Sequence, residues 1–522
     1  MRRIALWFIK MNKLKFSFIA LAIFLSQASW AGGLLTNTNQ NVAFNRMLSR
    51  EASIGIDGVY SNPAGVAFLK DGLHLSLNWQ LVFQSRIINN EFPLYALNQN
   101  NNSTTREFKG TAFAPVLPSI QAAYNWKKFS FQAMFGITGG GGKCTFDNGL
   151  GSFEKIVGET AMGVTGLAQA LDGASHGALG LTSPAMFGKK GYSFDSYMRG
   201  RQYYYSFSLG AAYRVLPELS AFAGVRGVYA LSNYYGYVRN IKVGNVPLYT
   251  MLDATKTGSA NIELNCDQSG VGFTPVLGID YKTGRWNFAM KYEFKTRMRL
   301  KNEAVNQLPS IGNLPQTLGV MFVQKGMTPA QAQAVLTNPT VLGAMKGIKE
   351  QFDQKIDEAT GEFADGKKVA ADIPAYLAIG AGYSPVDALR INAGFHYFFD
   401  KQATAYQHRE DKLKRGTMEW NAGVEFDATK TITVSAGWQN TSYGLTKEYM
   451  DDKSFVANSN SVGVGACIHL SKKIDLNVAY FHTFYSHFNG DKTENLNGTI
   501  LPYKADFTRN NNVFGAGVDI SF

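Results

Sequence analysis

The sequence predicts an all-β fold, a transmembrane 14-stranded antiparallel β-barrel. Three observations predict it. Segments in which apolar and polar residues alternate recur along the chain, as in strands that have one apolar face. The connections between them are short and long in turn, which is the rule for outer-membrane barrels. Finally, the chain is rich in Phe (36), Tyr (25) and Gly (53), and only 17% of its residues are charged.

Residues 1–31 have the features of a secretory signal peptide. Basic residues precede an apolar run, FSFIALAIFL, and Ser29 and Ala31 have the spacing of a cleavage site. A membrane anchor is the alternative, but the run is shorter than the about 20 residues that a spanning helix needs. Met1 and Met11 both fit as the start, because MNKLKFSF is a complete basic region by itself.

Charge and reactive residues exclude several classes of protein. The positive charge is scattered and forms no Lys/Arg stripe, so we expect no nucleic-acid partner. Three cysteines, Cys144, Cys266 and Cys467, are odd in number and far apart, which predicts neither a disulfide framework nor a metal site. Histidines are present, but no G-x-S-x-G nucleophile elbow accompanies them. We therefore expect no enzyme and no cofactor.

Alternation places the strands along the chain. Leu73, Leu75, Leu77 and Trp79 alternate with polar residues, and the last residues before Phe522 repeat the pattern. Fourteen segments result, an even number as in bacterial outer-membrane barrels. The two longest connections are 140–199 and 303–370. The predicted strands are 72–88, 107–125, 128–139, 200–214, 218–240, 258–282, 285–302, 371–384, 387–403, 415–427, 430–444, 455–470, 473–488 and 505–522.

Residues 32–71 precede the strands and do not alternate. They contain GVYSNPAGVAFL, with Asn62, Pro63 and Ala64 at its centre. This stretch resembles the N-terminal hatch of the long-chain fatty acid transporter (FadL-type) outer-membrane protein family, and segments 139–154 and 371–385 are similar to others of that family. The resemblance covers essentially all of residues 32–522. It implies a hatch inside a barrel of 72–522, located in the outer membrane of a Gram-negative bacterium. Phe522 is similar to the terminal signal that the barrel-assembly machinery recognises.

The run GITGGGGKCTFDNG is not a phosphate-binding loop. The pattern G-x-x-x-x-G-K-[ST] requires glycine at position 137 and a hydroxyl at 144, where the chain has Ile137 and Cys144. Gly139, Gly140, Gly141 and Gly142 instead end the predicted third strand, where glycine tolerates bulges and positive φ. The resemblance implies that the third strand kinks inward here and opens a lateral gap towards lipid. A glycine-rich loop is the alternative.

Inward-facing positions of the strands supply candidate ligand residues. A fatty acid needs a cation for its carboxylate and an apolar channel for its tail. Four inward cations could bind the carboxylate. For each of them the alternative is a lumen ion pair with an acid such as Glu293, Glu419 or Glu425. Two inward phenylalanines could line the channel for the tail. The candidates are Arg226, Lys291, Lys295, Arg390, Phe222 and Phe398.

These features predict passive outer-membrane transport of hydrophobic compounds. Long-chain fatty acids are the first candidate for the cargo. We expect capture in the long loops, binding in the lumen and lateral release beside the third strand. The loop 303–370 contains helix starts at Thr328-Pro329 and Asn338-Pro339. A channel for aromatic hydrocarbons and a structural or adhesive surface barrel are the alternatives. The expected partners are the hydrophobic solute and outer-membrane lipid, and we expect a monomer.

Overall fold

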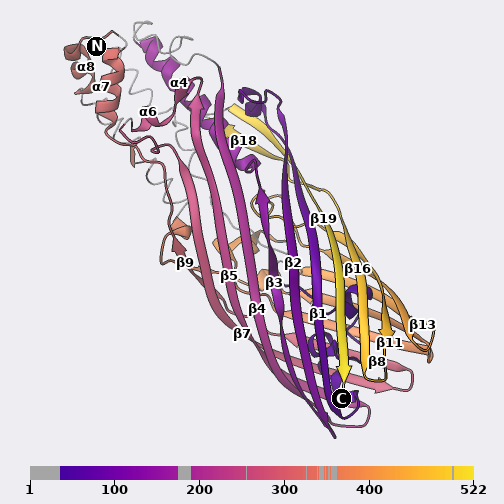
Figure 1. Cartoon of the computed structure of the whole chain (residues 1–522). Helices are drawn as coiled ribbons and strands as arrows, with labels where there is room; N and C mark the ends of the chain where they lie inside the picture. The colour runs from indigo at the N-terminus through magenta and orange to yellow at the C-terminus, as the bar shows by residue number, and fades with distance from the viewer. Residues whose placement is uncertain are drawn as a thin grey trace.

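The computed structural model shows a closed antiparallel β-barrel of fourteen strands, as predicted (Figure 1). It describes residues 36–174, 190–253, 255–324, 326–337, 361–496 and 499–522, with a few isolated positions between 338 and 360. Each barrel strand pairs with the next, and the last pairs with the first, which closes the wall. The barrel strands are β1 (Gly72–Glu91), β2 (Thr105–Trp126), β3 (Phe129–Phe146), β4 (Tyr192–Arg214), β5 (Leu219–Val243), β7 (Ile262–Thr283), β8 (Trp286–Glu293), β11 (Tyr376–Val386), β12 (Leu389–Phe398), β13 (Thr417–Asp427), β14 (Ile432–Ser442), β15 (Ser459–His469), β16 (Ile474–Tyr485) and β19 (Thr499–Ser521).

Some predicted boundaries are wrong. The third strand does not end at 139, because β3 continues to Phe146, and β4 begins at Tyr192. The first long connection is therefore 147–191 and not 140–199. The second is 305–367 and not 303–370, because the short strands β9 (Arg299–Ala304) and β10 (Lys368–Ala370) pair with each other. The predicted signal peptide, both starts, Met1 and Met11, and residues 32–35 lie outside the described residues.

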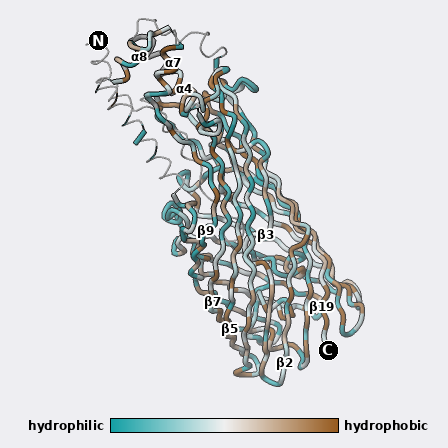
Figure 2. The backbone as a smooth tube through the Cα atoms, turned by 60° about the vertical axis from the view of Figure 1, so that its left-hand side comes forward, coloured by the Kyte–Doolittle hydropathy of each residue, from teal (hydrophilic) through white to brown (hydrophobic). Residues whose placement is uncertain are grey.

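The exterior of the wall is apolar. Along β1 the outward Leu77 is 49% exposed and the inward Ser76 is 0% exposed, as the alternation predicts. Large side chains such as Trp420 and Phe522 are also on the exposed surface. Figure 2 shows hydrophobic and hydrophilic residues mixed along the strands. Such an outward apolar band is the lipid-facing surface of a transmembrane barrel.

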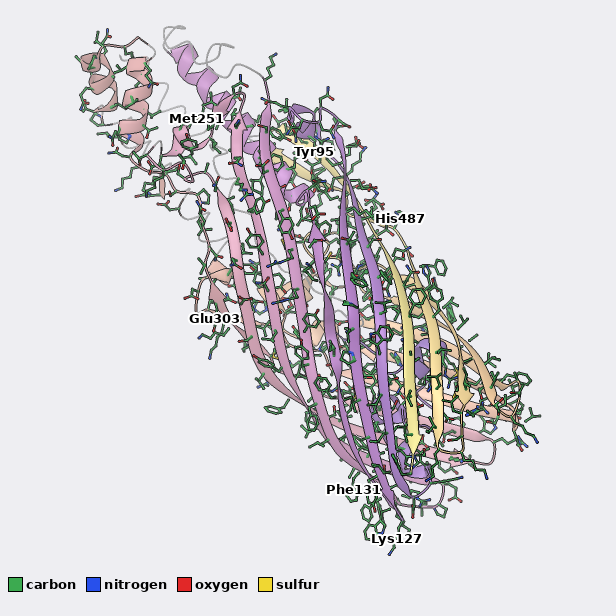
Figure 3. The ribbon with its side chains drawn as sticks, viewed as in Figure 1. Tyr95, Lys127, Phe131, Met251, Glu303 and His487 are labelled. Atoms are coloured by element: carbon green, nitrogen blue, oxygen red, sulfur yellow. The ribbon has the colours of Figure 1, made fainter. Side chains whose placement is uncertain are left out.

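The wall is much taller on one side. Strands β4 and β5 have 23 and 25 residues, whereas β12 and β13 have 10 and 11. About 9–11 tilted residues suffice to cross a bilayer, so the long strands extend beyond it at the end that carries the loops. In Figure 3, Tyr95 and Met251 lie at this loop end, and Lys127 and Phe131 lie at the opposite, turn end.

Helices and short strands cover the loop end. Their buried apolar residues, among them Phe153, Phe363 and Phe455, form one large cluster with the upper parts of the long strands, which we call the outer apolar cluster. Helix α8 begins at Pro329, as predicted, whereas Asn338 lies outside the described residues. The elements are α4 (Gly151–Ala174), α6 (Tyr249–Leu252), α7 (Leu314–Gln324), α8 (Pro329–Leu336), the 3₁₀ turns η3 (Pro93–Leu97), η4 (Gly361–Phe363), η5 (Asp400–Gln402) and η6 (Tyr406–Lys412), and strands β6 (Val246–Pro247), β17 (Phe488–Asn489) and β18 (Lys492–Leu496).

Among the described residues, no helix has the length and apolar character that crossing a membrane requires.

Residues 36–71 lie inside the barrel. They form α2 (Val42–Arg46), α3 (Gly58–Ser61) and the 3₁₀ turn η2 (Gly65–Phe68), and most of their side chains are buried. Helix α2 packs against β1, β14, β15, β16 and β19, and α3 packs against β2 and β3. This segment, which we call the hatch, therefore contacts the wall on several sides.

Candidate functional site

The wall is interrupted between β2 and β3. The two strands pair from Gly110 to Phe113 and again from Ile120 onwards, but not between these segments. Strand β3 stays paired with β4 throughout, with bulges between Ile137 and Gly139 and between Gly140 and Gly142. Gly140 and Gly141 have φ of +68° and +116°, which L side chains rarely adopt. The structure thus places the four predicted glycines at a break in the wall, which we call the β2–β3 gap.

The first residues of the hatch cover the unpaired edge of β3. The Asn37 backbone N–H donates to the Thr138 carbonyl (2.8 Å), and the Asn37 side chain donates to the Gly140 carbonyl (2.7 Å). The Gln40 side chain donates to the Ile137 carbonyl (2.9 Å). On the β2 side, the Ser119 hydroxyl donates to the Gln40 carbonyl (2.5 Å). These bonds replace the missing strand ladder, since buried backbone groups need partners.

Apolar side chains also converge on the gap. A Cβ atom placed on Gly141 would lie 2.8 Å from Leu117 Cδ2 and 3.8 Å from Ile137 Cγ2. Leu117 belongs to β2 and Ile137 to β3, so apolar side chains from both edges of the gap lie within 4 Å of this one point. The gap is therefore closed by side chains and by hatch residues and not by backbone pairing.

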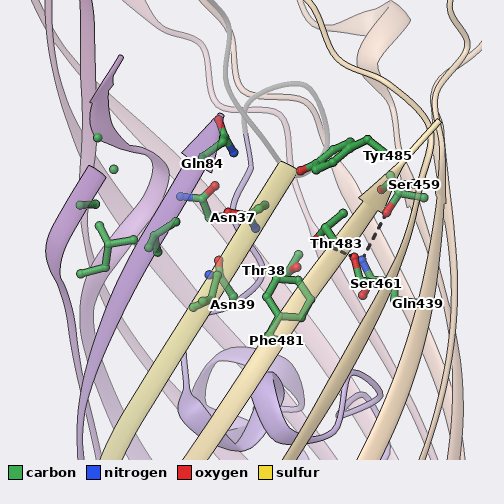
Figure 4. Close-up of a pocket in the computed structure, with 18 of the residues that line it drawn as sticks. Asn37, Thr38, Asn39, Gln84, Gln439, Ser459, Ser461, Phe481, Thr483 and Tyr485 are labelled. Atoms are coloured by element: carbon green, nitrogen blue, oxygen red, sulfur yellow. Dashed lines mark hydrogen bonds between the residues drawn. The ribbon is translucent and has the colours of Figure 1, made fainter. Parts of the chain in front are cut away.

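A cavity of about 150 Å³ lies against the inner side of the gap (Figure 4). Hatch residues form one side of it, and strands β1, β2, β3, β13, β14, β15, β16 and β19 form the rest. Polar amides and hydroxyls mix with apolar and aromatic side chains in its lining. The lining residues include Asn37, Thr38, Phe44, Gln84, Leu117, Gly140, Gly141, Gly142, Glu419, Phe481, Tyr485, Asn511 and Val513.

A second, larger recess of about 1160 Å³ lies at the turn end. It is lined by hatch residues from Ala43 to Asp71 and by the short turns, including Arg285 and Asp387. Asn37, Thr38, Asn39 and Phe44 of the hatch line the cavity, whereas Ala43, Arg46 and residues from Arg50 onwards line the recess. The hatch thus lies between the two spaces and separates the lumen from the turn end.

Each of the four predicted ligand cations has an acidic partner, as the alternative predicts. Arg226 and Lys291 both contact Glu293, the latter at 3.0 Å. Arg390 pairs with Asp427 (2.5 Å) and Glu425 (3.4 Å).

Lys295 lies nearer the rim. It donates to the Gln402 carbonyl (2.9 Å) and lies 3.9 Å from Asp372. The structure does not bring the four predicted cations together at the cavity, since none of them belongs to its lining. A role for them in ligand binding stays a prediction.

The predicted apolar residues also lie away from the cavity lining. Phe222 packs against Ala64 of the hatch, and Phe398 stacks on Tyr376, with ring centroids 4.6 Å apart. The motif around Pro63 attaches the hatch to the wall. The Asn62 side chain donates to Asp280 (2.6 Å), and Gln132 and Ser220 donate to the carbonyls of Pro63 and Ala64 (2.7 and 2.6 Å).

Charged side chains hold the remainder of the hatch. Arg50 binds Asp57 through Nε (2.7 Å) and Nη2 (2.9 Å), and reaches Glu425 on β13 through Nη1 (3.1 Å). Arg46 contacts the same Glu425 oxygen at 2.6 Å. These four side chains are at most 9% exposed. Buried charges are tolerated only when they are paired, so this cluster fixes the hatch to one face of the wall.

A buried histidine adds a further link. His396 on β12 lies between Glu51 of the hatch (Nε2 to Oε1, 2.5 Å) and Glu419 on β13 (Nδ1 to Oε2, 2.8 Å). Glu419 also accepts a hydrogen bond from Thr441 (2.8 Å) and lines the cavity. The link therefore connects the hatch with the cavity wall.

Sequence reasoning missed two arginines above the cavity. Arg86 on β1 and Arg509 on β19 are partners in the strand register and face inward, 2% and 4% exposed. Both guanidinium groups lie over the Phe455 ring, at 5.8 and 5.7 Å from its centroid. The alternation that begins at Leu73 and ends at Phe522 does assign both to the inner face. Their proximity follows only from the closure of the barrel.

Comparisons with known proteins agree with the architecture. A scan against protein-family models and a search of curated proteins both found no match. Among solved structures, the chain is similar to a FadL homologue of Pseudomonas aeruginosa, with a TM-score of 0.57 and 13% identity over 95% of this chain and 100% of the other. It is also similar to a mutant of TodX, a monoaromatic hydrocarbon channel, with a TM-score of 0.51 and 13% identity over 93% and 99% of the two chains. The chain therefore has the fold of the FadL-type outer-membrane channels.

Proposed function

We propose that this protein is a FadL-type channel of the Gram-negative outer membrane that passes hydrophobic compounds. Long-chain fatty acids are the first candidate for its cargo. The observation that carries the proposal is the cavity beside the β2–β3 gap. Cargo captured at the outer apolar cluster would enter the lumen, occupy the cavity and leave sideways between Leu117 and Ile137 into lipid. The hatch residues at the gap, Asn37 and Gln40, would have to move for this step. The concentration gradient would supply the driving force.

Two features support lateral release over passage through the turn end. The hatch separates the cavity from the turn-end recess and is fixed to the wall by buried ion pairs. The gap is instead closed by two apolar side chains and a few hydrogen bonds. Opening the gap breaks fewer strong contacts, so it is the less costly route.

Aromatic hydrocarbons are the second candidate cargo, and the size of the cavity favours them. An apolar cavity of about 150 Å³ accommodates one benzene ring, and the lumen cavity has about that volume. The polar residues in its lining distinguish the lumen cavity from a fully apolar benzene site.

Recognition of Phe522 by the assembly machinery and a monomeric state stay predictions.

A cross-link across the gap tests the proposal. Leu117→Cys and Ile137→Cys would be combined in a chain whose three native cysteines are replaced by alanine, and joined by a short thiol-specific cross-linker. Uptake of oleate and, separately, of toluene into cells lacking their own channel would be measured. We expect the cross-link to abolish uptake and a reducing agent, acting on a cleavable linker, to restore it.

The matched control joins two outward residues that already pair. Val464 and Tyr480 are register partners on β15 and β16, so a cross-link there should leave uptake unchanged. If the gap cross-link leaves uptake intact, lateral release is wrong. If the wild-type protein takes up neither compound, transport itself is wrong, and a structural or adhesive barrel becomes the better interpretation.

A further inference from the structure

We propose that Arg86 and Arg509, which we call the outer arginine pair, bind the carboxylate of a hydrophobic acid at the outer end of the lumen. The inference rests on the proposed function, because it names the head group that the channel recognises. It differs from the sequence-based expectation, which placed the carboxylate on cations that the structure shows next to acidic residues.

Arg509 has hydrogen-bonding capacity that the protein does not use. Its side chain is 4% exposed, and its Nε and Nη2 atoms are buried without a hydrogen-bond partner in the part of the chain that the structure describes. Its described contacts are with aromatic rings, Phe455 and Tyr485, both 5.7 Å from Cζ. An aromatic face stabilises a cation but leaves its N–H groups unsatisfied. A buried arginine in this state is a donor set for an anion.

Arg86 brings a second positive charge to the same place. It is the register partner of Arg509 and lies over the same Phe455 ring, and its Nε donates to Gln84 (3.3 Å). Like charges directly opposite in a sheet destabilise it. A carboxylate bound beside them would reduce this repulsion and accept hydrogen bonds from the pair.

The pair lies between the entry region and the cavity. Gln84, Tyr485 and Asn511 line the cavity, and the arginines follow two residues further along β1 and β19 towards the loop end. Phe455, under both guanidinium groups, belongs to the outer apolar cluster. A hydrophobic acid arriving from the loops would therefore meet the pair before the cavity, with apolar surface for its chain on one side.

The acid nearest to the cavity does not compete for the pair. Glu419 is the only acidic residue among the described lining residues, and it already contacts His396 (2.8 Å) and Thr441 (2.8 Å). Glu419 is therefore engaged by His396 and Thr441, and it leaves the guanidinium of Arg509 to a bound carboxylate.

Paired ligands that differ only in the head group test the inference. Oleate and oleyl alcohol would be titrated into the purified full chain in neutral detergent, with native mass spectrometry or calorimetry as readout. We expect oleate to bind at least tenfold more tightly than oleyl alcohol. Arg509→Gln should weaken oleate about tenfold and leave oleyl alcohol unchanged, and Arg509→Lys should retain part of the preference. Arg285→Gln, which removes a half-exposed charge at the turn end, is the control.

The outcomes separate the inference from the function. If Arg509→Gln and Arg86→Gln both bind oleate as the wild type does, or weaken both ligands equally while folded, the inference is wrong and transport stands. If the wild type binds both ligands equally, the head group is not recognised and the inference is also wrong. If it binds neither ligand, the inference and fatty acids as cargo are both refuted, and the toluene uptake measured above decides whether transport of hydrophobic compounds stands.

Discussion

Replacing Arg50 by alanine should release the hatch. Arg50 makes two hydrogen bonds to Asp57 and one to Glu425, and its side chain is 6% exposed. Glu425 keeps Arg46 and Arg390 as partners. Asp57 has no other ion-pair partner among the described residues. The substitution therefore leaves one buried carboxylate without compensation.

The size of the effect follows from that carboxylate. Removing one partner of a buried ion pair costs about 3–5 kcal/mol. An undocked hatch would expose Asp57 to water and recover most of this cost. The equilibrium between docked and undocked hatch should therefore shift by a factor between roughly one hundred and a few thousand.

Single-channel recording in planar bilayers measures this shift. We expect Arg50→Ala to open the barrel to ions far more often than the wild type. Arg285→Ala is the matched control, since Arg285 is half-exposed and its partner Asp387 is 99% exposed, and such surface pairs contribute at most about 1 kcal/mol. A folded Arg50→Ala protein with wild-type conductance would show that this cluster does not hold the hatch.

Two further predictions concern the gap and the outer loops. Gly140→Ala should lower the free energy of unfolding in urea by at least about 1–2 kcal/mol, because φ is +68° there and the added Cβ would clash with the Gln202 carbonyl oxygen. Gly142→Ala, whose Cβ would meet only Ala114 at 3.9 Å, should stay within about 0.5 kcal/mol; equal losses would contradict the backbone argument. In α4, burial raises the pKa of Glu159 to about 7, although Lys155 lies 3.8 Å away. A raised carboxyl pKa destabilises the fold above pH 7, and this penalty disappears as the pH falls towards 4.5. Limited proteolysis within α4 should therefore be slower at pH 5 than at pH 8, and Glu159→Gln should remove the difference. A pH dependence that persists in this variant would assign it to another group.

The sequence predicts the wall well and its irregular part poorly. Alternation reports which residues have side chains on which face, so it locates strands such as β1 and β13 to within a few residues. In the run Gly139–Gly142 no side chains alternate, and the predicted strand stops at 139. The backbone nevertheless keeps pairing with β4 as far as Phe146, because strand pairing uses backbone groups that glycine also has.

For the hatch too, the sequence predicts one part of the arrangement and only the structure shows the other. Its existence and the position of Asn62 follow from the resemblance and from the absence of alternation. The partners of its charges do not, because Arg50 and Glu425 belong to distant parts of the chain and meet only inside the closed barrel.

The sequence by itself determined the faces of the strands, since a period of two residues is a local property. It placed Arg226, Lys291, Arg390 and Arg509 alike on the inner face, and it did not distinguish the three that have acidic partners from Arg509, whose Nε and Nη2 have no hydrogen-bond partner among the described residues. Only the tertiary structure decided this, because the partner of an inward side chain comes from a neighbouring strand or from the hatch. Arg226 on β5 meets Glu293 on β8 past the intervening strand β7, whereas Arg509 meets Arg86 because β19 closes the barrel against β1.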